Sequence, residues 1–299
     1  MQKTLRKYFP MFVLPTLIAF VIAFLIPFLM GIYLSFTEFT TVTNAKWVGW
    51  KNFDILFFGG KHIEGVTSGQ LLLYGKVSGE FLNALWFTVK FTVVSVLTVN
   101  VFAFALALLL TKNARGTNLY RTVFFMPNLI GGIVLGVLWQ LLFNGILSHW
   151  GKTLVSDARF GFWGLVILMN WQMIGYMMII YIAGIQSIPG ELYDAADVDG
   201  ASGWKRLTHV TLPMVMPSVT ICTFLTLTNS FKLFDQNLAL TAGAPSKKTA
   251  MLALDIYETF YDRSGFEGIA QAKAVLFFLL VALIAFVQLY LTRRKEVDR

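Results

Sequence analysis

A polar stretch near the middle of the chain carries the residue types that are best suited to binding chemistry. Asp194, Asp197 and Asp199 place three carboxylates close together, and carboxylates form strong charge-assisted hydrogen bonds with arginine side chains. Ala195 and Ala196 lie beside them, and such small side chains would let the backbone of a partner come close. We therefore predict a surface that binds another protein, and not a catalytic centre.

Two short helices are predicted to build this surface, within the segment 187–213. Ser187 and Pro189 suit the start of the first helix, because a side-chain oxygen can cap it and proline is tolerated in its first turn. Gly200 permits the backbone reversal that ends this helix. Ser202 can then cap the second helix.

The second helix carries Trp204 and Leu207, and these residues allow an alternative interpretation. An amphipathic helix that lies on a lipid surface would bury both side chains. That alternative accounts badly for the three neighbouring carboxylates, because the anionic cytoplasmic leaflet repels them. Docking of another protein is the favoured interpretation, and Trp204 belongs to the predicted docking surface.

The sequence contains no pattern typical of a catalytic, metal or nucleotide site. His62, His149 and His209 are scattered, and the single cysteine has no partner for a disulfide. A phosphate-binding loop needs a glycine, four residues and then Gly-Lys-Ser/Thr, but five residues separate Gly145 from Gly151. We expect no enzyme activity, no metal and no cofactor on this chain, so any ATP must be bound by another chain.

The elements that position the polar stretch are predicted to be membrane helices. The 299 residues are 57% hydrophobic and 13% charged, whereas soluble domains contain about 45–50% apolar and about 25% charged residues. A helix needs about 20 apolar residues to cross the hydrocarbon core. The charge-free windows predict an all-α integral membrane protein with a single transmembrane domain over 1–299. Its six spans are expected at approximately 10–36, 88–111, 122–144, 162–185, 210–231 and 273–292.

Lysine and arginine near the span ends predict the orientation, because they mark the cytoplasmic side. They are denser at both termini and in the connections 112–121 and 186–212 than in the longer connections 37–80 and 232–272. Both termini and the segment 187–213 are therefore expected in the cytoplasm, and the two longer loops outside it. The net charge of +8 fits this orientation better than nucleic-acid binding, because the basic residues form no clustered stripe.

The polar stretch resembles the EAA loop of ABC importer permeases, whose pattern is Glu-Ala-Ala, two residues, Asp-Gly-Ala and a later Leu-Pro. Asp194-Ala195-Ala196 and Asp199-Gly200-Ala201 match this pattern, with aspartate in place of glutamate, and Leu212-Pro213 follows at the right distance. The resemblance implies the type I ABC importer permease fold with a cytoplasmic coupling loop over 187–213. The residues that it implies for coupling to an ATPase are Asp194, Ala195, Ala196, Asp199, Gly200, Ala201 and Trp204.

Four further stretches resemble the sugar-import permeases of the maltose type, at 48–53, 121–127, 183–189 and 241–245. Such permeases lie in the prokaryotic cytoplasmic membrane and work as pairs on two ATPase subunits, which bind ATP and Mg. An extracytoplasmic binding protein delivers their substrate. The resemblance therefore implies import of a sugar or oligosaccharide, with a second, different permease subunit as the partner in the membrane.

The resemblance also places the substrate contacts in the fourth and fifth predicted spans. Polar residues at membrane depth are costly unless they serve a function, and sugars bind to aromatic faces and amides. The candidates on this basis are Trp171, Gln172, Tyr176 and Asn229. Hydrogen bonding between helices is the alternative role of these residues. Import of another solute, such as glycerol phosphate or an amino acid, and a secondary transporter stay open as alternative functions.

Overall fold

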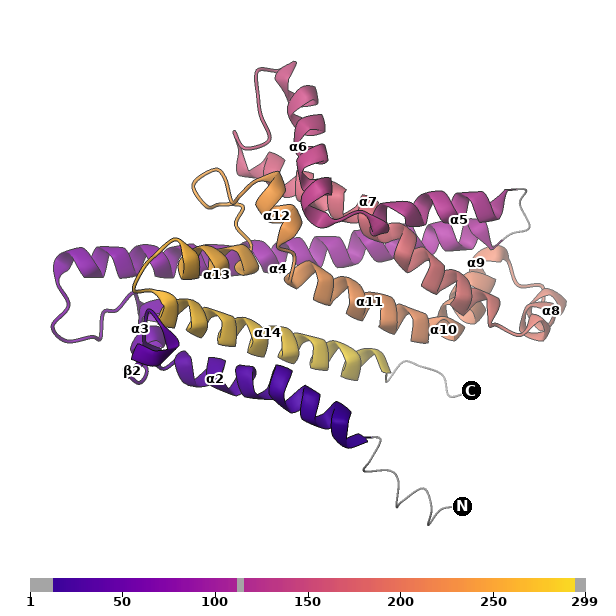
Figure 1. The fold of residues 1–299 in the computed structure, drawn as a ribbon. Coiled ribbons are helices and arrows are strands. Elements are labelled where there is room, and N and C mark those ends of the chain that lie inside the picture. Colours follow the sequence, from indigo (N-terminus) through magenta and orange to yellow (C-terminus); the bar gives the residue numbers. More distant parts are fainter. Residues whose placement is uncertain (1–12, 112–115, 294–299) are drawn as a thin grey trace, which may run out of the picture. The chain divides into compact units, whose positions relative to one another are not determined.

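The computed structural model describes residues 13–111 and 116–293. Helices dominate this part of the chain, and its only strands are β1 (Thr37–Glu38) and β2 (Lys46–Trp47), which pair antiparallel (Figure 1). The α-helices are α2 (Ile26–Leu34), α3 (Lys51–Phe58), α4 (Ser68–Leu110), α5 (Thr117–Phe125), α6 (Gly132–Ser148), α7 (Ala158–Gln186), α8 (Gly190–Val198), α9 (Gly203–Arg206), α10 (Leu212–Met214), α11 (Met216–Phe231), α12 (Asp235–Leu240), α13 (Leu252–Tyr261) and α14 (Glu267–Arg293). The start of the first predicted span, at 10–12, lies outside the described residues.

Within the described residues, four helices are long and apolar enough to cross a membrane, namely Val13–Leu34, Ser68–Leu110, Ala158–Gln186 and Glu267–Arg293. Two further candidates are bent pairs, Thr117–Leu129 with Gly132–Ser148 and Gly203–Met214 with Met216–Phe231. The count reaches the six predicted spans if each bent pair crosses the membrane once.

The spans differ from the prediction in length and in shape. Helix α4 has 43 residues and begins at Ser68, so the residues 68–80 are helical where a loop was expected. At 1.5 Å per residue α4 measures about 65 Å, twice the roughly 30 Å of a hydrocarbon core. The third span bends by 100° at Ile130 and Gly131, whose extended backbone separates the 3-10 helix η3 (Met126–Leu129) from α6.

The chain divides into two compact units, Met1–Phe81 with Ile256–Phe278 and Leu82–Asp255 with Leu279–Arg299. In the first unit the amide of Asn52 donates hydrogen bonds to the carbonyl oxygens of Ser35 and Thr37, at 2.9 Å each. These carbonyl groups follow the last turn of α2 and need partners outside that helix. Asn52 therefore fixes α3 against the end of α2.

The second unit has a core built mainly from α4, α7 and α11. Phe91, Leu165 and Cys222 are fully buried in it, and the Tyr181 hydroxyl donates to the Asn100 amide oxygen at 2.7 Å. A Cβ atom at Gly175 of α7 would collide with a backbone carbonyl of α5. This glycine therefore lets two helices approach closely, as small residues do in membrane proteins.

Candidate functional site

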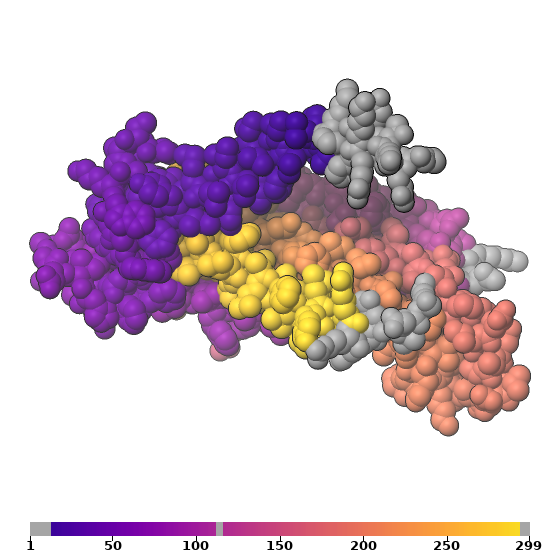
Figure 2. Space-filling view, turned by 90° about the horizontal axis from the view of Figure 1, so that it is seen from below, coloured from indigo at the N-terminus to yellow at the C-terminus, as the bar shows by residue number. Residues whose placement is uncertain are grey.

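The two short helices predicted within the segment 187–213 are present, and we call Gly190–Arg206 the elbow. It consists of α8, a turn at Gly200 with φ of +65°, and α9. The Ser202 hydroxyl caps α9 by accepting a hydrogen bond from the backbone nitrogen of Lys205 at 3.4 Å. Ser187 does not cap α8, because that helix begins only at Gly190 and the Ser187 hydroxyl donates to a carbonyl within the last turn of α7. Figure 2 shows the elbow protruding at one end of the second unit, in salmon.

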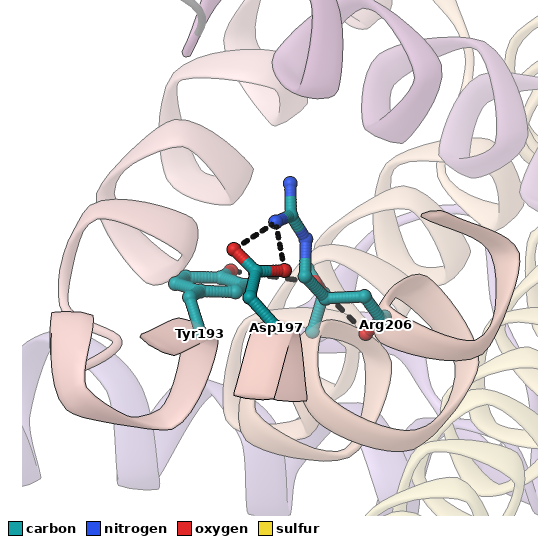
Figure 3. Close-up of polar contacts among 4 residues, drawn as sticks. Tyr193, Asp197 and Arg206 are labelled. Carbon is teal, nitrogen blue, oxygen red and sulfur yellow. Dashed lines mark hydrogen bonds and ion pairs between the residues drawn. The ribbon is translucent and has the colours of Figure 1, made fainter. Parts of the chain in front are cut away.

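An internal ion pair holds the two arms of the elbow together. One guanidinium nitrogen of Arg206 lies 3.0 and 3.2 Å from the two carboxylate oxygens of Asp197 (Figure 3). The same guanidinium lies 5.4 Å from the centre of the Tyr193 ring. The Tyr193 hydroxyl in turn lies 3.3 Å from the Thr211 hydroxyl, beyond α9. Asp197 therefore stiffens the elbow, a role that the sequence did not reveal.

The remaining carboxylates of the elbow are exposed. The side chains of Glu191, Asp194 and Asp199 form no hydrogen bond or ion pair with any residue that the structure describes. Trp204 is 73% exposed and Val198 is 88% exposed. Ala196, by contrast, is buried at 9% exposure, whereas its neighbour Ala195 is exposed. The available surface of the elbow thus combines three carboxylates that have no partner among the described residues with apolar side chains.

A second feature of the same unit is a polar cavity of ≈ 290 Å³, beside the middle of α7 and the C-terminal end of α11. Gln172 of α7 and Asn229 of α11, two of the four predicted substrate contacts, line it. Asn128 of η3 and Gln236 of α12 add two further amides. The complete lining is Asn128, Met169, Gln172, Met173, Asn229, Lys232, Leu233, Phe234, Asp235 and Gln236.

Hydrogen bonds between amides hold the cavity walls. The Gln236 amide nitrogen donates to the Gln172 amide oxygen at 2.8 Å, which joins α12 to α7. The Gln172 nitrogen donates to the carbonyl oxygen of Ile130 at 3.3 Å, at the bend of the third span. The Asn229 nitrogen donates to Leu225 of its own helix at 2.8 Å. The Asn229 amide oxygen therefore stays available as an acceptor, since no described residue donates to it.

Interrupted helices explain why the cavity lies here. Asn128 sits in the 3-10 turn η3, and Lys232, Leu233 and Phe234 lie between the end of α11 and the start of α12. Irregular backbone at membrane depth is tolerated where protein covers it or where it lines a water-filled cavity. The cavity therefore provides the surroundings that both interruptions require.

The other two predicted substrate contacts lie elsewhere. Trp171 is 42% exposed and packs edge-on against Trp139, with ring centres 5.5 Å apart. Tyr176 packs against Phe125 at 6.4 Å. Neither residue is among those that line the cavity in the described part of the chain. Adjacent residues of a helix point about 100° apart, so Gln172 faces the cavity and Trp171 does not.

Sequence reasoning missed Asn128, Lys232, Asp235 and Gln236 as residues of the cavity lining. A signal was present for Asn128, because it is an amide beside Pro127 within a charge-free window. No comparable signal marked Gln236, which follows the fifth predicted span and lies in the predicted outer connection 232–272. Its place in the cavity depends on the chain folding back as α12.

Comparisons with known proteins agree on one family. The family model described as "binding-protein-dependent transport system inner membrane component" matches residues 99–297. The "probable starch degradation products transport system permease protein" of Thermoanaerobacterium thermosulfurigenes is 42% identical over 296 residues, with 96% of this chain and 94% of the relative covered. The "multiple sugar-binding transport system permease protein" of Streptococcus mutans is 28% identical, with 99% of both chains covered.

A solved structure shows the same fold. It is a chain from a crystal structure of "a bacterial ABC transporter involved in the import of the acidic polysaccharide alginate". The TM-score is 0.77 at 20% sequence identity, and the match covers 98% of each chain. At this identity the likeness concerns the arrangement of the helices alone. The helices of this chain thus adopt the fold of an ABC importer permease.

Proposed function

Because the chain belongs to the family of binding-protein-dependent transport system inner membrane components, we propose that it is the permease subunit of an ATP-driven sugar importer. The observation that carries this proposal is the connection between the elbow and the cavity. The elbow joins α7 to α10 and α11, and the middle of α7 and the far end of α11 bear Gln172 and Asn229 of the cavity. A displacement of the elbow therefore acts on two cavity walls.

The elbow is the proposed contact with an ATPase subunit. Asp194 and Asp199 offer unpaired carboxylates to arginine or lysine side chains of that subunit. The coupling residues are Asp194, Ala195, Ala196, Asp199, Gly200, Ala201 and Trp204, with Ala196 supporting the turn from inside. ATP and Mg are bound by the ATPase and not by this chain. In this arrangement the elbow and both termini face the cytoplasm, and the connections 37–80 and 232–272 face outward.

The cavity is the proposed substrate site, and a sugar is the substrate class that fits its lining. Four amides supply the donors and acceptors that sugar hydroxyl groups need, and Gln172 and Asn229 are the central contacts. The names of two relatives, which refer to starch degradation products and to multiple sugars, support the same class. A volume of ≈ 290 Å³ favours one or two sugar rings at a time over a longer chain. A second permease subunit, two ATPase subunits and an extracytoplasmic binding protein complete the proposed importer.

Substitution of Gly200 by valine tests the proposed coupling. A left-handed conformation costs a β-branched residue at least about 1–2 kcal/mol, so the elbow should change shape. Gly203→Val is the matched control, because Gly203 has the same open surroundings and no positive φ. In reconstituted transporter we expect ATP-driven uptake of labelled malto-oligosaccharide to be lost in the first variant and kept in the second. Full uptake by Gly200→Val would refute the coupling role of the elbow.

The substrate class is tested in the same vesicles. Labelled malto-oligosaccharide, glycerol phosphate and amino acids are offered separately, each with a matching binding protein. Accumulation of the sugar alone is the expected result. Accumulation of a phosphate ester or an amino acid without any sugar would overturn the substrate class but leave the family membership intact.

A further inference from the structure

The first unit carries a cluster of aromatic rings directly after the helix Val13–Leu34, and we call it the aromatic cap. Its residues are Tyr33, Phe36, Trp47, Trp50 and Phe53. The Trp47 ring stacks on Phe36 with centres 5.5 Å apart, and it lies 5.7 Å from Tyr33. Trp50 meets Phe36 edge-on at 5.1 Å and lies 5.3 Å from Phe53. The rings therefore support one another as a single packed group.

The two tryptophans of the aromatic cap are nevertheless largely exposed, at 62% for Trp47 and 70% for Trp50. They are held in place by backbone structure. Trp47 pairs with Thr37 in the register of β1 and β2, and the backbone nitrogen of Val48 donates to the Phe36 carbonyl at 2.9 Å. A tryptophan that is exposed but held in one position is suited to contact a partner that can surround an apolar ring and accept a hydrogen bond from its N–H.

The surroundings of the aromatic cap identify this partner. The helix Val13–Leu34 is almost unburied within the structure, with 6% of its apolar window buried, and so presents apolar side chains outward. Tyr33, 53% exposed in the last turn of that helix, continues this apolar surface into the Trp47 ring. Charged residues lie next to the aromatic cap. Lys51 directly follows Trp50 in the chain and forms an ion pair with Glu38 at 2.9 Å.

This order of apolar, aromatic and charged side chains matches the membrane–water interface, where tryptophan and tyrosine are enriched. We propose that Trp47 and Trp50 form a lipid-interface anchor, with their rings among the phospholipid headgroups at the polar end of the first span. The anchor fixes the depth and rotation of that span. A soluble partner, such as a binding protein or a free sugar, fits less well, because the surface is continuous with the unburied apolar side chains of the helix Val13–Leu34.

Fluorescence of the assembled transporter in vesicles tests the anchor. The double variant Trp47→Phe/Trp50→Phe removes two fluorescent side chains but keeps an aromatic ring against Phe36. Subtracting its emission spectrum from that of the unaltered protein gives the emission of Trp47 and Trp50 alone. We expect this difference spectrum to lie at shorter wavelengths than tryptophan in water. Phospholipids brominated high on the acyl chain should quench it, and aqueous iodide should not. Free tryptophan in the same buffer supplies the reference spectrum of a fully hydrated ring.

Three results would overturn the proposal. The difference spectrum could be quenched by iodide and not by brominated lipid, which would place the rings in water. The difference spectrum could instead shift only when the binding protein is added, which would assign the surface to that protein. It could also shift only when sugar is added, which would assign the surface to the sugar. If the double variant does not assemble, the two single variants give the same readout for one ring each.

Discussion

The Asp197–Arg206 ion pair gives a quantitative prediction about the stiffness of the elbow. The two side chains are 58% and 43% exposed, and a pair at such an exposed position contributes about 0.2–1 kcal/mol. The guanidinium also lies over the Tyr193 ring, and an exposed cation–π contact adds about 0.5–1 kcal/mol. Replacing Arg206 by glutamine removes both interactions, so the closed turn should lose roughly 1 kcal/mol.

Amide hydrogen exchange in the reconstituted protein measures this loss. The backbone nitrogens of Asp199, Gly200 and Ala201 donate the hydrogen bonds that close the turn. If they exchange through local opening, a loss of roughly 1 kcal/mol makes their exchange about fivefold faster. Asp197→Asn leaves the ring contact in place and should accelerate exchange less. Added salt should reduce the difference between the Arg206→Gln variant and the unaltered protein, because it screens exposed charges.

Lys205→Gln is the matched control for this prediction. It removes the same charge one residue earlier, and no described residue accepts a hydrogen bond from the Lys205 ammonium group. Exchange at the turn should stay unchanged in this variant. Equal acceleration in both variants would assign the effect to net charge, and unchanged exchange in Arg206→Gln would show that the ion pair does not stiffen the elbow.

Three more predictions concern the cavity and the helix contacts. Gln236→Leu deprives the buried Gln172 oxygen of its donor, which should destabilise the protein by about 1–3 kcal/mol, as a lowered midpoint of thermal unfolding in detergent would show. Asn229→Ala should lower sugar uptake several-fold without reducing assembly, and unchanged uptake with unchanged substrate preference would remove it from the substrate contacts. Gly175→Val should prevent α5 and α7 from packing and abolish assembly, measured by size-exclusion chromatography, whereas Gly145→Val should assemble normally because nothing lies near that glycine.

Local chemistry made several features predictable. The lack of charges in long windows indicated the membrane helices, because a charge at the centre of a bilayer is costly in any fold. Gly200 and Ser202 indicated the turn and the second cap of the elbow, because a positive φ and a free backbone nitrogen are demands of the local backbone. The predicted capping role of Ser187 was wrong, because its hydroxyl donates to the carbonyl oxygen of Gly184 in the last turn of α7.

Contacts between distant segments decided the rest. That Gln172 faces the cavity and Trp171 does not depends on which side of α7 meets η3 and α12. That Asp197 is paired while Asp194 and Asp199 are unpaired depends on the angle between α8 and α9. The sequence alone therefore determined where the long apolar helices lie and where the elbow turns, because each residue carries its own solvation and backbone preferences. Only the tertiary structure determined which polar groups meet, because pairing depends on helix rotation and spacing that no single segment specifies.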